Sequence, residues 1–167
     1  MQRALRCCLA GLGVLLATPL DAALNSTFQV TAQIVAGCLV VGGASNYGVL
    51  DYGSQSALST GILSTSLGGT TVTFQCTPGV ALSMSLDGGQ NTASGLRYLK
   101  RSGSAHLQPY QLFRDAAYSQ ALGIGTSVAV SYTDPTAIKL AVYGRTQLSG
   151  TLPAGTYTDV VQVTVTW

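Results

Sequence analysis

The chain has 167 residues, enough for one domain plus a processed segment, and its formal net charge is only +2. Charged residues make up 8% of it and hydrophobic residues 47%, which excludes a disordered chain and a nucleic-acid binder that acts through a basic surface. The low charge and the many Gly, Thr and Val residues favour an all-β sandwich.

Residues 1–22 carry the pattern of a secretory signal peptide. Arg3 and Arg6 give a positive start, and residues 7–17 form an apolar run that is too short to span a bilayer. We expect cleavage near Ala22, and therefore export. The alternative is a buried core helix, for which the rest of the chain offers no helical partner.

The segment that follows, residues 28–36, alternates between apolar and polar side chains. One face carries Phe28, Val30, Ala32 and Ile34. The other face carries Gln29, Thr31 and Gln33. This period of two indicates a β-strand, so we expect the mature chain to begin with a strand.

Cysteine usage predicts one disulfide bond. Cys7 and Cys8 leave with the signal peptide, so the mature chain keeps only Cys38 and Cys76. In an exported protein, exactly one possible pair favours a bridge over two buried free thiols. Closing a loop of this length stabilises a fold by about 4 kcal/mol in the chain-entropy model.

Short strand-like runs separated by Gly-rich spacers occupy the middle of the chain. These runs are residues 47–52, 70–76, 80–86, 96–100, 106–113, 127–132 and 138–143. No long stretch has a helical period, and residues 114–121 could form a single helical turn at most. About eight or nine strands at this spacing predict a Greek-key sandwich.

The last stretch, Val160–Trp167, is the most regular strand pattern in the sequence. Val161, Val163, Val165 and Trp167 share one face, while Gln162, Thr164 and Thr166 share the other. We expect this strand to lack a later partner within the chain. A long apolar strand with an open edge is an aggregation hazard unless another segment covers it.

Catalytic chemistry finds no support in the sequence. His106 is the single histidine, and a lone histidine seldom holds a metal. The five aspartates of the mature chain lie mostly beside turn residues, as in Asx-turns. Arg97, Lys100 and Arg101 are interpreted as a solvated strand end. We therefore predict no catalytic, cofactor-binding or metal site.

Several motifs follow one another in the order and spacing of a known family. They are LDYG at 50–53, FQCT at 74–77, LDGG at 86–89, RYL at 97–99, YQLFRD at 110–115, YG at 143–144 and PAGTYTD at 153–159. Together they resemble the spore coat protein U-like domain, found in subunits of archaic (Csu-type) chaperone–usher pili. The resemblance covers essentially the whole mature chain. One departure is Tyr52, where the family pattern has Phe.

The resemblance implies an incomplete immunoglobulin-like Greek-key sandwich over residues 37–167, completed by a donor strand from another molecule. Residues 23–36 would hold the donor strand, whose apolar face is Phe28, Val30, Ala32 and Ile34. That face would enter a neighbour's groove beside the strand that carries Val161, Val163, Val165 and Trp167. A strand added in this way gains affinity from its backbone and specificity from its side chains.

The resemblance also implies partners and a location. A periplasmic chaperone would fill the groove first, an outer-membrane usher would export the subunit, and neighbouring subunits would then polymerise into a fimbrium on a Gram-negative cell surface. Such a fimbrium would support adhesion and biofilm formation. Two alternatives remain open: a tip adhesin or carbohydrate-binding sandwich, and a spore or cell-coat protein that fills its own groove.

Overall fold

The computed structural model describes residues 27–43, 46–67 and 72–167. The expected signal peptide, residues 1–22, lies outside this range. The chain divides into two units, Met1–Ile34 and Val35–Trp167. Within the described part there is no helix long and apolar enough to cross a membrane.

Strands are the only regular elements among the described residues, which confirms the prediction of an all-β chain. The first five are β1 (Cys38–Val41), β2 (Ile62–Leu67), β3 (Thr73–Cys76), β4 (Leu82–Leu86) and β5 (Arg97–Arg101). The next five are β6 (Leu107–Phe113), β7 (Val128–Val130), β8 (Val142–Gln147), β9 (Tyr157–Thr158) and β10 (Val163–Thr166).

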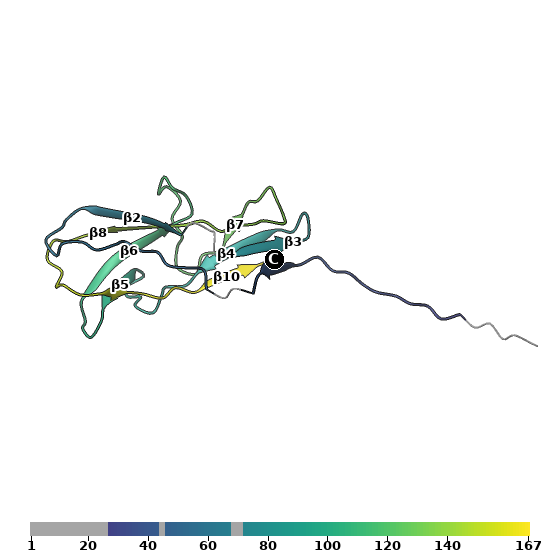
Figure 1. Cartoon of the computed structure of the whole chain (residues 1–167), viewed down its shortest axis with the longest axis horizontal. Coiled ribbons are helices and arrows are strands. Elements are labelled where there is room, and N and C mark those ends of the chain that lie inside the picture. Colours follow the sequence, from purple (N-terminus) through teal and green to yellow (C-terminus); the bar gives the residue numbers. More distant parts are fainter. Residues whose placement is uncertain (1–26, 44–45, 68–71) are drawn as a thin grey trace, which may run out of the picture. The chain divides into compact units, whose positions relative to one another are not determined.

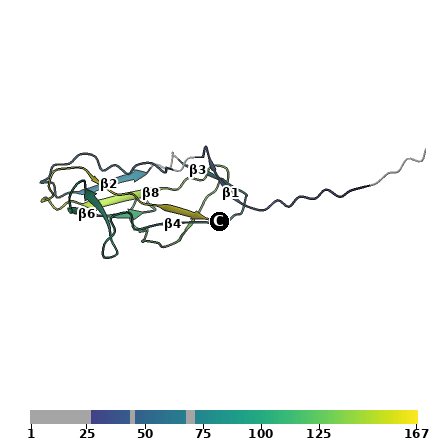
Figure 2. The same cartoon turned by 90° about the horizontal axis from the view of Figure 1, so that it is seen from below.

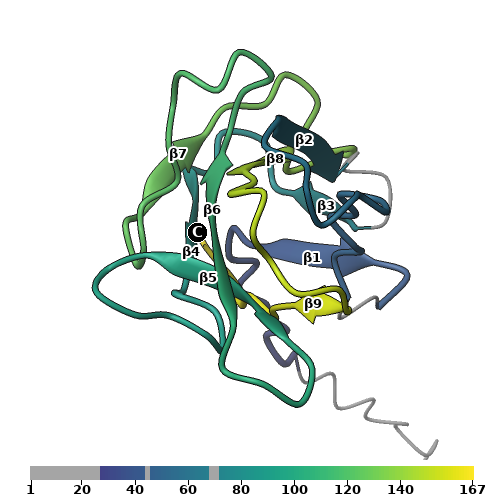
Figure 3. The same ribbon diagram turned by 90° about the vertical axis from the view of Figure 1, so that its left-hand side faces the viewer.

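The strands form three antiparallel sheets within the second unit. Their orders are β1-β3, β10-β4-β7 and β2-β8-β6-β5-β9. Figures 1 and 2 both show β2, β8 and β6 together and β4 separate from them, near the C-terminus. In the end-on view of Figure 3, β6 runs through the middle of the picture. Neighbours that are far apart in sequence, such as β4 and β10, are typical of Greek-key connections, and the fold is an immunoglobulin-like sandwich.

The core lies between the sheets, because alternate residues of each strand point inward. In β4 the burial alternates strictly, with Leu82, Met84 and Leu86 each no more than 4% exposed. Other core residues are Val72, Phe74, Tyr110, Leu112, Leu122, Ile138, Leu140 and Val142. Burying side chains of this size contributes about 1.5–3 kcal/mol each, so this layer is the main source of stability.

The predicted disulfide bond is present, and it joins β1 to β3. The sulfur atoms of Cys38 and Cys76 are 2.06 Å apart, and the two residues face each other in the β1–β3 register. The bridge therefore lies where the first strand of the sandwich begins and its partner ends.

Two predicted strands are absent from the structure, and three observed strands, β1, β2 and β9, lie outside every predicted range. Residues 28–36 and 47–52 carry strand-like alternation but have no assigned strand. A strand needs a neighbouring strand for its backbone hydrogen bonds, and no named strand of the described residues pairs with residues 28–36 or 48–52. Conversely, β2 is rich in Ser and Thr, which resembles a loop, but it pairs along its whole length with β8.

Candidate functional site

An open cavity lies between two segments that are remote in sequence. Residues 46–50 and Tyr52 form one wall, and residues 159–163 form the other. The cavity has a volume of about 860 Å³. Its floor includes core residues, among them Leu86, Tyr110, Leu112 and Val142. The cavity therefore has a largely apolar floor, although these four side chains are each no more than 7% exposed.

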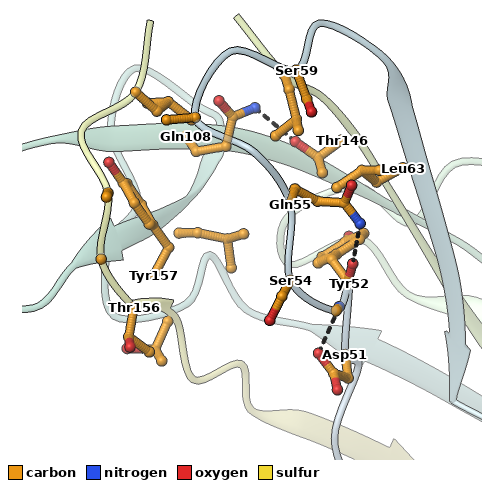
Figure 4. A pocket seen from close by; sticks show the side chains of 18 of the residues that line it. Asp51, Tyr52, Ser54, Gln55, Ser59, Leu63, Gln108, Thr146, Thr156 and Tyr157 are labelled. Carbon is orange, nitrogen blue, oxygen red and sulfur yellow. Dashed lines mark hydrogen bonds between the residues drawn. The ribbon is translucent and has the colours of Figure 1, made fainter. Parts of the chain in front are cut away.

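A second cavity, of about 600 Å³, continues along the same two walls. It lies between residues 49–57 with Ser59 on one side and residues 152–159 on the other. Figure 4 shows Tyr52 and Gln55 facing Thr156 and Tyr157 across it. We call the two spaces the larger and the smaller cavity.

The smaller cavity has a polar end that is fully buried. Gln108 and Thr146 are each 3% exposed, and the Gln108 side-chain amide donates a hydrogen bond of 2.7 Å to the Thr146 hydroxyl (Figure 4). The same amide donates to the Gln147 carbonyl at 2.7 Å. These bonds satisfy the polar groups internally, so the end of the cavity does not depend on a ligand.

The two cavities are parts of one groove, because five residues line both of them. These boundary residues are Val49, Leu50, Tyr52, Leu99 and Asp159. We call the whole space the open groove. It runs between residues 46–59 and residues 152–163, across the floor of the sandwich.

Both walls of the groove carry backbone edges without a partner strand. Strand β10 pairs with β4 on one side, and no described strand pairs with its other side. Residues 48–52 make no backbone–backbone hydrogen bond to another described residue, although the Asn46 side chain accepts one from the Gly48 amide. Unpaired edges on both sides of an apolar floor fit an added strand.

A hydrogen-bonded aspartate, Asp159, supports the part of the second wall that lines both cavities. Asp159 accepts hydrogen bonds from the Tyr110 hydroxyl at 2.7 Å, from the Asn91 amide at 3.2 Å and from the Asn91 side chain at 3.1 Å. Burial, together with this bond to Asp159, raises the pKa of Tyr110 above its usual range. Gly89 has a positive φ of 75°, and a Cβ there would overlap the Asp159 carboxylate.

Arg97 corrects the interpretation of a solvated basic cluster. It is only 4% exposed, and its guanidinium donates hydrogen bonds to the carbonyls of Asp87, Leu86, Leu122 and Gly123 at 2.7–3.4 Å. Burial lowers the pKa of Arg97. The side chain therefore braces the end of β4 and the loop at 122–123 beneath the groove.

The predicted acceptor residues fall on the groove wall to different extents. Val161 and Val163 line the larger cavity, and Val165 packs against the core. Trp167 is 57% exposed, although it shares their alternation. The inward face of this strand is therefore part of the groove over residues 159–163.

The predicted donor residues have exposed side chains. Phe28 is 87% exposed, Val30 80% and Ile34 97%, and Ala32 is also exposed. These apolar side chains are not part of any assigned strand.

Sequence reasoning missed the first groove wall and the polar supports. The sequence predicts an ordinary strand over residues 47–52, a turn position for Asp159 and a solvated position for Arg97. The motifs that contain Asp51, Asp87 and Asp159 were the sequence features from which the groove could have been found, because each of these aspartates lines one of the two cavities or both. In the described part of the chain, no three His, Cys, Asp or Glu side chains gather as metal ligands would.

The Spore Coat Protein U domain family matches residues 24–164 of the chain. The chain is also similar to a solved chaperone–tip adhesion subunit pre-assembly complex, CsuC–CsuE, from the archaic chaperone–usher Csu pili of Acinetobacter baumannii. That similarity has 18% identity and a TM-score of 0.48, and it covers 80% of this chain and 40% of the other.

A chaperone–tip adhesin complex of CFA/I fimbriae biogenesis is similar at 15% identity and a TM-score of 0.46, over 78% of this chain and 41% of that one. The chain thus spans about two fifths of the length of each of these two solved chains. The comparison with curated proteins gave no match.

Proposed function

Since the chain belongs to the Spore Coat Protein U domain family, we propose that it is a structural fimbrial subunit. In this proposal, it polymerises by donor-strand complementation, in which each subunit inserts a strand into the open groove of its neighbour. The contact is head-to-tail and does not close, so it builds a filament.

The observation that carries this proposal is the open groove itself. A closed sandwich would cover its core with a strand between its first and last strands. Here the floor residues Leu86 and Leu112 belong to the core, yet they line a cavity whose two walls have unpaired backbone edges. A strand inserted there gains hydrogen bonds on both sides and removes apolar surface from water.

The segment at residues 28–34 supplies a strand of suitable chemistry. It alternates apolar and polar side chains, and its large apolar members are 80–97% exposed. Ordering it costs about 1–2 kcal/mol of backbone entropy per residue. It is therefore stable as a strand only where hydrogen bonds and burial together offset that cost.

The proposal includes the partners and the location that the family resemblance implies. A periplasmic chaperone holds the groove closed with a strand of its own until an outer-membrane usher passes the subunit to the growing fibre. The assembled fimbrium lies on the cell surface and supports adhesion and biofilm formation. The role in this proposal is structural.

A pair of matched charge substitutions in the donor segment tests this function. Ile34→Asp places an unpaired carboxylate on the inward face, whereas Gln33→Asp places the same group on the outward face. Burying a charge without a partner is costly, so we expect Ile34→Asp to abolish polymers and Gln33→Asp to leave most of them.

The measurement is the ladder of SDS-resistant oligomers extracted from the cell surface of the source bacterium without boiling. Soluble periplasmic subunit should persist in both variants, because the chaperone's own strand fills the groove. Equal loss of polymer in the two variants would show that the donor strand lies elsewhere in the chain.

A further inference from the structure

The outward face of the largest sheet carries positive charge without any negative charge. Strands β2, β8, β6, β5 and β9 lie in that order (Figures 1 and 3), and alternate residues of these strands point away from the core. The outward charged residues are Arg145 in β8 and Lys100 in β5. No Asp or Glu occupies any position of these five strands. The face therefore complements an acidic ligand.

A cluster of three aromatic rings lies on this face. The β6–β8 register places Phe113 opposite Tyr143, and Tyr118 comes from the loop after β6. The Tyr118 ring meets the other two edge to face, with its centroid 5.4 Å from that of Phe113 and 6.3 Å from that of Tyr143. Phe113 is only 7% exposed, whereas both tyrosines are half-buried. The two tyrosines are thus the accessible part of an aromatic cluster on the outer side of the sheet.

The loop holds Tyr118 there in a strained backbone conformation. Its φ is 56°, a value that bulky residues rarely adopt. The Asp115 carboxylate accepts hydrogen bonds from the amides of Ser119 and Gln120 at 2.7–3.2 Å and from the Ser119 hydroxyl at 2.8 Å. Strain of this kind persists only where the surroundings enforce it, and it is concentrated at binding sites. The same bonds turn the nearby carboxylate toward its own loop.

Arg145 lies beside the rings with its hydrogen-bond donors available. Its guanidinium carbon is 5.4 Å from the centroid of the Tyr118 ring, which is a cation–π contact. No hydrogen bond or ion pair joins this side chain to another described residue. The register places Ser64 on one side of Arg145 and Gln111 on the other, and both are exposed. A guanidinium binds a carboxylate through two parallel hydrogen bonds, and hydroxyl and amide groups bind hydroxyls.

We propose that this outer patch binds an acidic polysaccharide, a chain of sugars that carry carboxylates. The Arg145 guanidinium binds a carboxylate, and Ser64 and Gln111 bind sugar hydroxyls. The rings of Tyr118 and Tyr143 contact the apolar faces of the sugars. The patch lies on the face of the sheet opposite the one that lines the open groove, so this binding goes beyond the proposed function and does not require polymerisation.

Two features favour a polysaccharide over a protein partner. The exposed outward neighbours of Arg145 and Tyr143 are Ser64, Ser66 and Gln111, so the patch lacks the apolar centre of a stable protein interface. Neighbouring strands are about 4.8 Å apart, close to the length of one sugar ring. An extended sugar chain that crosses β2, β8 and β6 therefore meets one strand with each sugar.

Three polymers test the proposal with the chain purified from the periplasm, together with any chaperone that accompanies it. Polygalacturonate carries sugar rings and carboxylates, its full methyl ester carries the rings alone, and polyacrylate carries the carboxylates alone. We expect polygalacturonate to bind at least about tenfold more tightly than either of the others, as measured by calorimetry at low salt. Equal binding of polyacrylate would overturn sugar recognition, and equal binding of the ester would overturn the role of the carboxylate.

Substitutions locate the binding on the outer patch. Arg145→Gln should lower the affinity for polygalacturonate about tenfold, to that of the ester. Lys139→Gln removes the same charge from an exposed residue outside the sheet and should leave the affinity unchanged. Tyr118→Gly removes a ring but accepts the positive φ, and it should weaken the binding of both sugar polymers by about three- to tenfold. An Arg145→Gln variant that melts like the parent and binds polygalacturonate equally well would overturn the proposal.

The results also separate this proposal from the proposed function. Binding of polygalacturonate by a chain that forms no SDS-resistant oligomers would contradict only the fimbrial assembly. Oligomers without binding would contradict only the sugar site. If polygalacturonate does not bind and Arg145→Gln instead lowers the oligomer yield, the patch contacts another copy of the chain, and its assignment to a polysaccharide is wrong.

Discussion

At the scale of single residues, one buried and one half-buried polar side chain, Arg97 and Asp159, support the groove. Arg97 joins the end of β4 to the loop at 122–123 through carbonyl oxygens, and Asp159 anchors the part of the second wall that lines both cavities. Neither interaction is a salt bridge with an exposed partner. Each satisfies backbone or side-chain groups that would otherwise be buried without a partner, which is costly.

We therefore expect Arg97→Gln to lower the free energy of unfolding by about 2–4 kcal/mol, because several buried carbonyls lose their donor. Lys100→Gln is the matched control, since it removes the same charge from an exposed position of the same strand. It should change stability by less than about 0.5 kcal/mol. Urea denaturation of the two purified variants measures both changes in the free energy of unfolding. Equal changes in Arg97→Gln and Lys100→Gln would contradict the bracing role of Arg97.

These residues also show the limit of sequence reasoning. Alternation of side chains identifies which side of a strand is apolar. The expected export, together with only two cysteines in the mature chain, predicts the pair Cys38 and Cys76. Arg97 belongs to a local run of basic residues, and nothing in that run distinguishes the buried arginine from the exposed Lys100. Its burial depends on carbonyls of residues 86–87 and 122–123, which only the tertiary fold brings together.

At the scale of elements, β1 depends on a single neighbour. It has four residues and pairs only with β3 among the described strands. On its own, such a short two-stranded sheet is weak. The Cys38–Cys76 bridge compensates, because it closes a loop with a sequence separation of 38 and restricts the unfolded chain.

Replacing both cysteines, as Cys38→Ser with Cys76→Ser, should lower the free energy of unfolding by about 4 kcal/mol. Reducing agent should destabilise the unmodified protein by a similar amount and leave the double variant unchanged. Thermal unfolding with and without reductant measures both effects. A double variant as stable as the oxidised parent would contradict the stabilising role of the bridge.

The strands that sequence predicted well are those with regular alternation and a partner in the same chain. β4 and β6 fall within their predicted ranges, and β10 lies within the predicted terminal strand. Residues 47–52 have a similar alternation but no assigned strand. Alternation indicates which side chains could be buried, but it does not tell whether a neighbouring strand is present to pair with the segment. The open groove follows from that missing neighbour, so its first wall could not be read from the sequence.

At the scale of the whole molecule, assembly should complete the sheet on both sides of the inserted strand. Amide hydrogens of residues 48–52 have no backbone acceptor among the described residues in the single chain. In the proposed polymer the alternate amides that point toward the donor strand gain one, and their exchange with solvent should slow by about two orders of magnitude or more, if local opening then costs some 3 kcal/mol.

Hydrogen exchange read by mass spectrometry can compare monomer with polymer. Residues 82–86 of β4, already paired on both sides, serve as the internal control and should be protected in both states. If exchange at residues 48–52 is equally fast in the two states, the inserted strand does not pair with this wall.

The placement of the disulfide has a mechanical consequence. In a fibre of such subunits, tension enters each domain through the donor segment, and Cys38 follows Ile34 by four residues. The bridge passes this load covalently to Cys76 in β3, which adjoins the core, so the pull does not peel β1 from its neighbour one hydrogen bond at a time. A stretched filament should therefore fail by extraction of the donor strand or by unravelling of the remaining domain before β1 and β3 separate at the bridge.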